Sequence, residues 1–126
     1  MATDVNILDM TYRAFGDLRS NQFHAVEFQA AKVVQLCSAV TAIACGIIQN
    51  NPNSGDVAVV RHLGVTKYKS WSGAYANHLG TTAVGTLKVV TPGTDTTHYV
   101  IGQGLESTVS GDIGSMKILG TPVRAT

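Results

Sequence analysis

Apolar and polar side chains alternate over several short stretches of the chain, the pattern typical of half-buried β-strands. Glycine, proline and asparagine separate these stretches, and strands commonly end at such residues. We therefore predict strands over residues 23–28, 32–36, 44–49, 57–65, 85–90, 98–101 and 115–119. Short strands at this spacing predict an all-β single domain: a small β-sandwich or a partly open β-barrel of short antiparallel strands.

The clearest turn is NNPNSG at residues 50–55. Proline fixes φ, and asparagine and glycine tolerate the left-handed positions that turns require. The segments 44–49 and 57–65 on either side of it are therefore predicted to pair as a β-hairpin. Residues 80–82 are also interpreted as a turn.

Residues 1–22 follow a different pattern, since apolar side chains recur at helical spacing. These positions are Val5, Leu8, Tyr12 and Phe15, with Ile7 and Met10 lying off the stripe. Two alternatives remain open: a short amphipathic helix packed on its own domain, or an extended arm that docks on a neighbouring subunit. We accordingly divide the chain into an N-terminal arm, residues 1–22, and a β-rich domain, residues 23–126.

Charge is sparse, because only 13% of the 126 residues are charged and the formal net charge is +1. This balance argues against affinity for duplex nucleic acid or for a charged membrane surface. Residues 1–20 lack the continuous apolar core of a secretory signal peptide, and the apolar stretch 33–48 is interrupted and shorter than a bilayer span of about 20 residues. So few charges suggest that part of the surface is covered by other proteins.

Catalytic signatures are missing from the sequence. The four histidines are scattered without metal-ligand spacing, and His98, near Asp95 in a threonine-rich turn, is interpreted as a hydrogen-bonded surface histidine. Cys37 and Cys45 match neither a redox pair nor a zinc framework, and we interpret them as buried free thiols, with a disulfide as the alternative if a hairpin is centred on Thr41. We expect no enzyme activity, catalytic residue, metal, cofactor or small-molecule substrate.

An aromatic cluster lies at Tyr68, Trp71 and Tyr75, with Lys67 and Lys69 alongside. Such side chains can stack nucleic-acid bases or sugar rings. The alternative is that they pack in the core or at a subunit contact, where large aromatics supply buried area.

Four segments in order resemble the capsid decoration proteins of tailed bacteriophages, also called head cement or stabilisation proteins. They are GIIQNNPNSG at 46–55, AVVRHLGVTK at 58–67, VIGQGLE at 100–106 and GDI at 111–113. Two parts of the chain depart from the family's pattern: residues 66–79, which are richer in aromatic side chains, and the N-terminal segment 1–22, which is longer. These departures suggest that the chain makes contacts of its own there.

The resemblance implies a structural virion protein, made in the cytoplasm of the host bacterium, that binds the outer surface of an assembled capsid. It would bridge subunits of the major capsid protein lattice, with self-association, a trimer favoured, and no nucleic-acid or membrane partner. The alternatives are a tail or baseplate β domain, and a glycan- or single-strand-binding module that uses the aromatic cluster. The candidate protein-interface residues are Val5, Ile7, Leu8, Met10, Tyr12, Phe15, Tyr68, Trp71 and Tyr75.

Overall fold

A computed structural model describes residues 5–71, 78–91 and 93–125, and within these ranges the chain is all-β, as predicted. The strands are β1 (Val5–Ala14), β2 (Ala25–Ala30), β3 (Val33–Leu36), β4 (Gly46–Ile48), β5 (Val57–Lys69), β6 (His78–Thr81), β7 (Leu87–Val89), β8 (Tyr99–Gly104) and β9 (Ile113–Arg124).

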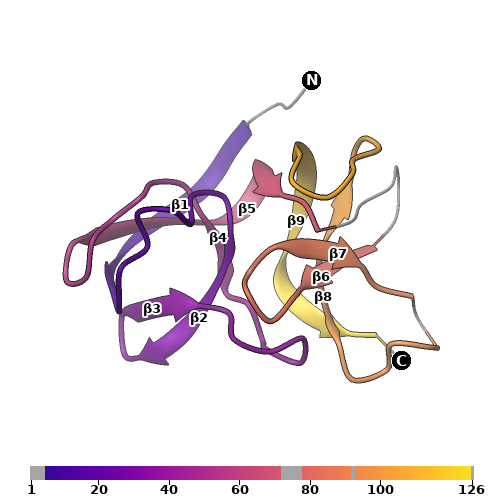
Figure 1. The fold of residues 1–126 in the computed structure, drawn as a ribbon, viewed down its shortest axis with the longest axis horizontal. Helices are drawn as coiled ribbons and strands as arrows, with labels where there is room; N and C mark the ends of the chain where they lie inside the picture. Colours follow the sequence, from indigo (N-terminus) through magenta and orange to yellow (C-terminus); the bar gives the residue numbers. More distant parts are fainter. Residues whose placement is uncertain (1–4, 72–77, 92, 126) are drawn as a thin grey trace.

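The strands form one mixed sheet in the order β1-β3-β2-β4-β5-β9-β8-β6-β7, with an additional pairing of β1 with β5. The pairings of β1, β3, β2, β4 and β5 therefore form a cycle, whereas β9, β8, β6 and β7 continue from β5 as an open extension. Figure 1 shows these two halves side by side, joined by the long strand β5. The sheet as a whole does not close into a clear barrel. The prediction of antiparallel strands holds for most pairs, but β1 and β3 are parallel at Arg13 and Ala14.

The helical interpretation of the first segment is wrong, because residues 5–14 form strand β1. This strand is extended, as in the arm alternative, but its partner within the chain is β5, which it follows from Val5 opposite Val65 to Arg13 opposite Val57. Helical spacing of apolar residues is a weak signal when the same residues gain a full ladder of backbone hydrogen bonds from a neighbouring strand. Shifts in the register near Leu8 also break the strict alternation that marks a strand in sequence.

The predicted hairpin at residues 50–55 is confirmed. Ile47 pairs with Arg61 and Ile48 with Val60, so β4 and β5 run antiparallel. The Asn50 side chain ties the turn to β5, since it donates to the Val57 carbonyl at 2.9 Å and accepts from the Val59 amide at 3.0 Å.

Other strand boundaries differ from the predicted ones for local reasons. β2 begins two residues later than predicted because Phe23 has φ of +65°, which interrupts an extended strand. The turn predicted at residues 80–82 is wrong in part, since Gly80 and Thr81 belong to β6 and pair with β7. A side chain at Gly80 would lie 2.6 Å from the Val90 side chain, so the close packing of strands needs a glycine here.

Buried apolar side chains form three clusters. The largest lies between them and includes Ala25, Ile47, Tyr68, Leu79, Leu87, Ile101 and Met116. A second fills the cycle of strands and includes Leu18, Val26, Val34, Ile48 and Val60. A small third cluster consists of Val90, Val100 and Ala125.

Candidate interaction surface

Strand β1 carries apolar side chains on the surface. Ile7 is 65% exposed and Met10 is 44% exposed, and Leu8 between them is also exposed. Only Arg13 and Ala14 of β1 pair with β3, so the preceding part of its outer edge has no strand partner among the described residues. An open strand edge with apolar side chains is a common docking site for a partner protein.

The other candidates in the first segment have different environments. Tyr12 is half-buried, its ring packs edge-on against Phe28 at 5.2 Å, and its hydroxyl lies 2.7 Å from His62 Nε2. Tyr12 therefore packs mainly within its own domain. Phe15, just past the end of β1, is exposed. The backbone of Val5 belongs to β1, and its side chain lies outside what the structure describes.

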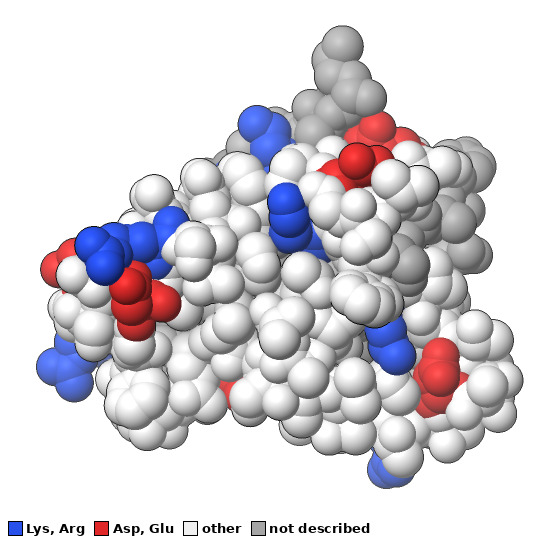
Figure 2. Space-filling model, in the orientation of Figure 1, with Lys and Arg blue, Asp and Glu red and all other residues white. Residues whose placement is uncertain are grey.

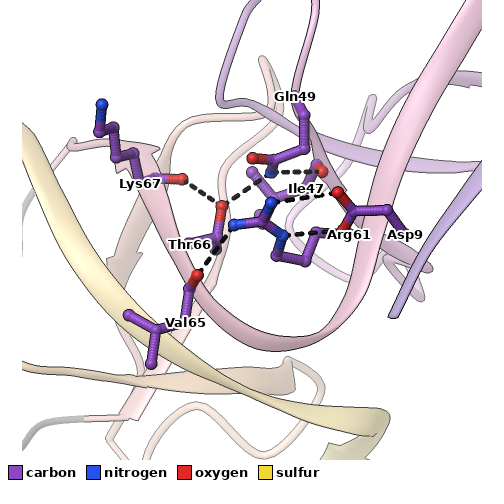
Figure 3. A network of polar contacts seen from close by, with 7 residues as sticks. All are labelled: Asp9, Ile47, Gln49, Arg61, Val65, Thr66 and Lys67. Carbon is purple, nitrogen blue, oxygen red and sulfur yellow. Dashed lines mark hydrogen bonds and ion pairs between the residues drawn. The ribbon is translucent and has the colours of Figure 1, made fainter. Parts of the chain in front are cut away.

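The ion pair between Asp9 and Arg61 joins β1 to β5, and Arg61 also contacts the backbone of its own strand (Figure 3). Arg61 Nε donates to Asp9 Oδ1 at 2.8 Å, Nη2 donates to Oδ2 at 3.1 Å, and Nη1 donates to the Val65 carbonyl at 3.0 Å. Burial raises the pKa of Asp9, an effect that His62 opposes, and burial lowers the pKa of Arg61. Because a guanidinium stays protonated in proteins and the contact has two points, both groups are ionised at neutral pH.

Gln49 extends this network to the end of β4. Its side-chain amide donates to the Ile47 carbonyl at 3.0 Å and to the Thr66 hydroxyl at 2.8 Å, and that hydroxyl donates to the Lys67 carbonyl at 2.9 Å. These contacts hold β4 against β5, so the exposed side chains of β1 sit on a firmly connected base.

The three aromatic candidates do not form one platform. Tyr68 is fully buried in the main core, where its hydroxyl lies 3.1 Å from the Thr108 hydroxyl and burial raises its pKa. Its assignment to a surface is therefore wrong, and the core alternative holds for it. Trp71 is 57% exposed, and Tyr75 lies outside the described residues. The alternation along β5 distinguishes Tyr68 from the lysines beside it, because Thr66 and Tyr68 are buried while Lys67 and Lys69 are half-buried.

Trp71 lies at an open pocket of about 380 Å³. The pocket is also lined by Val40, Thr82, Val84 and Lys88. Its apolar walls and single cation offer a surface for a flat ring or an apolar side chain.

Both thiols are free, as we interpreted them, but only Cys37 is buried and Cys45 is half-buried. Burial, the largest cause, raises the pKa of both Cys37 and Cys45 to about 12. The interpretation of His98 as hydrogen-bonded is wrong, since both ring nitrogens are buried without a hydrogen-bond partner among the described residues.

Across all the residues that the structure describes, no group of three or more His, Cys, Asp or Glu side chains is placed to hold a metal ion. Nor does any described segment form a helix long and apolar enough to cross a membrane.

Charged side chains are few on the face shown in Figure 2, where wide areas of other residues separate them. Exposed apolar side chains occur both on the first half of the molecule, as at Phe28 and Val57, and on the second half, as at Val109 and Val123. A surface of this kind is suited to contacts with proteins more than to contacts with polyanions.

Comparison with known proteins gives a structural neighbour. No family model and no curated protein matches this chain. Among solved structures, the chain is similar to the N base of head fiber gp8.5 in bacteriophage phi29, with a TM-score of 0.66 and 17% sequence identity. The match covers 92% of this chain and 97% of the other, so the two share their fold over nearly their whole length.

Proposed function

We propose that this protein is a structural component of a bacteriophage virion that binds the outer surface of the assembled capsid and stabilises it by bridging major capsid subunits. The observation that carries the proposal is the fold shared with a phage head fiber base over 92% of the chain. The sequence resemblance to capsid decoration proteins points to the same part of a virion through different evidence, the residues of the turn at 46–55 and the segments that follow it.

The geometry suits such a role. The exposed apolar side chains of β1 offer a first contact, and the connected sheet presents other faces to a second subunit or to a second copy of the protein. Each contact buries a modest apolar area, worth about 25 cal/mol per Å². A bridge between two shell subunits makes the second contact intramolecular, so modest affinities multiply. Self-association into a trimer would increase this effect further.

The role requires no chemistry from the protein. We propose that the protein is not an enzyme and needs no cofactor. The raised pKa values of its two thiols, which make them poor nucleophiles, agree with this proposal. Its partner would be the major capsid protein lattice, and it would join the virion after synthesis in the host cytoplasm.

The test uses DNA-filled capsids of the parent phage that lack this protein. The purified 126-residue chain is added back, bound protein is measured by co-sedimentation, and DNA release on heating is followed with an intercalating dye. We expect saturable binding and a higher release temperature. Capsids that neither bind the protein nor gain stability would overturn the proposal, and a reconstruction of the whole virion that places the chain on the tail would favour the tail or baseplate alternative.

The exposed Trp71 and its pocket favour one second candidate, a module that binds glycans or single-stranded nucleic acid. Titration with oligosaccharides and single-stranded oligonucleotides tests it through tryptophan fluorescence, because Trp71 is the only tryptophan. A saturable shift that is lost in Trp71→Ala would support this function, and an unchanged spectrum would exclude it.

A further inference from the structure

A second pocket lies where the loop before β2 meets the end of β5. It measures about 360 Å³, and its lining includes Arg19, Gln22, Phe23, His24, Lys69 and Ile113. Its residues come from three separate parts of the chain, so no local sequence pattern marks it. Backbone hydrogen bonds bring them together, since Phe23 accepts from the Lys69 amide at 2.9 Å and donates to the Ile48 carbonyl at 2.9 Å.

One lysine in the pocket lining and one beside it have no acidic partner among the described residues. Lys67 and Lys69 form no ion pair with any described residue, and Lys67 Nζ lies 5.7 Å from the centre of the Phe23 ring. Arg19 is paired with Asp17 through its Nη2 at 2.8 Å. No carboxylate lines the pocket. Lys69 belongs to its lining, and Lys67 lies beside it, next to the Phe23 ring, so the two ammonium groups give this region a local positive charge in a protein whose net charge is only +1.

His24 adds a neutral polar group to the pocket wall. The ring is held by the Gln22 carbonyl, 3.1 Å from His24 Nδ1. Burial lowers the pKa of His24, Lys69 lowers it further, and hydrogen bonds to backbone carbonyls oppose these effects. The ring is therefore neutral at neutral pH, so the positive charge near the pocket comes from the lysines and not from His24.

The backbone at the pocket is strained. Phe23 has φ of +65°, a conformation rarely found for a bulky aromatic residue because its side chain crowds the backbone there. Such outliers persist where the surrounding structure holds them, and they gather at binding sites. Here the strain places the half-buried Phe23 ring beneath Lys67, next to the 41% exposed Ile113.

We propose that this pocket binds a carboxylate side chain of a protein partner, with Lys67 and Lys69 meeting the charge and Phe23 and Ile113 packing against the adjoining apolar part of that partner. The apolar side chains favour a protein segment over a free anion, because a protein interface combines charged groups with apolar surface. The low net charge disfavours a polyphosphate backbone.

The inference deepens the proposed function and rests on it only for the identity of the partner, an acidic residue on a capsid subunit. The test compares the wild-type chain with Lys67→Gln/Lys69→Gln, which retains most of each side-chain stem and removes both charges. Lys32→Gln is the matched control, since Lys32 is an exposed lysine that lines a different pocket. All three proteins are first compared by chemical denaturation.

Binding of each protein to capsids that lack the wild-type chain is then measured at low and high salt. We expect the double variant to bind at least about tenfold more weakly at low salt and to lose most of its salt dependence, with Lys32→Gln close to wild type. If wild type binds and the double variant binds equally well, the pocket is not the contact and the proposed function still stands. If wild type does not bind capsids at all, the proposed function fails.

The pocket is tested separately from capsids with peptides and NMR. A hexaglutamate peptide should shift the amide signals of Phe23, His24 and Lys69 in wild type and not in the double variant, while a hexaglutamine peptide should shift neither. Equal shifts from inorganic phosphate would overturn the preference for a protein carboxylate. No shift with hexaglutamate would overturn the site itself.

Discussion

Asp9 of β1 meets the buried guanidinium of Arg61 on β5 through both of its carboxylate oxygens, across 52 positions of sequence. The Arg61 side chain is only 7% exposed. The pair therefore fixes the first strand in one register on the longest strand of the sheet, and the attraction within the pair is partly offset by the cost of removing both charges from water.

Breaking this pair should be costly. Asp9→Asn leaves Arg61 charged and buried, and we expect a loss of about 3 kcal/mol in the free energy of unfolding, measured by urea denaturation. Replacing both residues, as Asp9→Leu/Arg61→Met, should recover most of that loss. As a control, Asp17→Asn breaks a fully exposed ion pair and should move the midpoint little, although Arg19 lowers the Asp17 pKa to about 2. A double variant as unstable as Asp9→Asn would contradict this account.

Gly102 allows β8 to pack closely against β9. A side-chain carbon at this position would collide with the Lys117 carbonyl oxygen and the Met116 methyl carbon. Gly102→Ala should therefore destabilise the fold by about 3 kcal/mol. Gly111→Ala meets open space and bears only the strain of its φ of +90°, so a loss of about 1 kcal/mol is expected by the same denaturation assay. Equal effects of the two substitutions would argue against the close approach.

Lys32, in the turn between β2 and β3, has φ of +57°. Glycine adopts this conformation without the steric cost that lysine bears, so Lys32→Gly should stabilise the protein by about 0.5 to 1 kcal/mol. Lys32→Ala removes the same side chain and keeps the strain, and its unfolding midpoint should not rise. Thermal and urea unfolding of the three proteins measure the difference.

The thiols of Cys37 and Cys45 should make the free energy of unfolding fall at alkaline pH. The folded chain holds both thiol protons up to a pKa of about 12, whereas the unfolded chain releases them near pH 8.5. The folded state therefore binds more protons above that pH, and stability should fall as pH rises, by up to about 1.4 kcal/mol per pH unit for each thiol. Urea midpoints between pH 7.5 and 10 should decline in wild type and decline less in Cys37→Ala/Cys45→Ala. If the urea midpoints of the two proteins fell in parallel as pH rises, the thiols would be accessible to solvent and their pKa values would not be raised.

The exposed side chains of β1 should matter for partner binding more than for folding. Ile7→Ser/Met10→Ser changes two side chains that water already reaches, so the unfolding midpoint should stay near that of wild type. Capsid binding should weaken at least about tenfold if these side chains become buried at the contact. Val109→Ser changes an equally exposed apolar residue elsewhere on the surface and serves as the control. Unaltered capsid binding by the β1 variant would remove this edge from the interface.

The sequence by itself determined the all-β class, most strand positions and the β4–β5 hairpin. These depend on local chemistry: alternation between neighbouring side chains, and the turn residues around Asn50, act within a few positions of the chain. The errors arise where local chemistry does not decide the conformation. The conformation of residues 5–14 depends on pairing with β5, and the start of β2 depends on Phe23, whose left-handed backbone no sequence rule favours.

Only the tertiary structure decided which side chains share a surface. It buried Tyr68 in the core and left Trp71 exposed, although both belong to one aromatic stretch of the sequence. It also brought Arg19, Phe23 and Lys69 to one pocket and joined Asp9 to Arg61. Such contacts depend on where distant strands pair. The energy of each contact is set by burial and by distance in space, and the order of residues along the chain specifies neither directly.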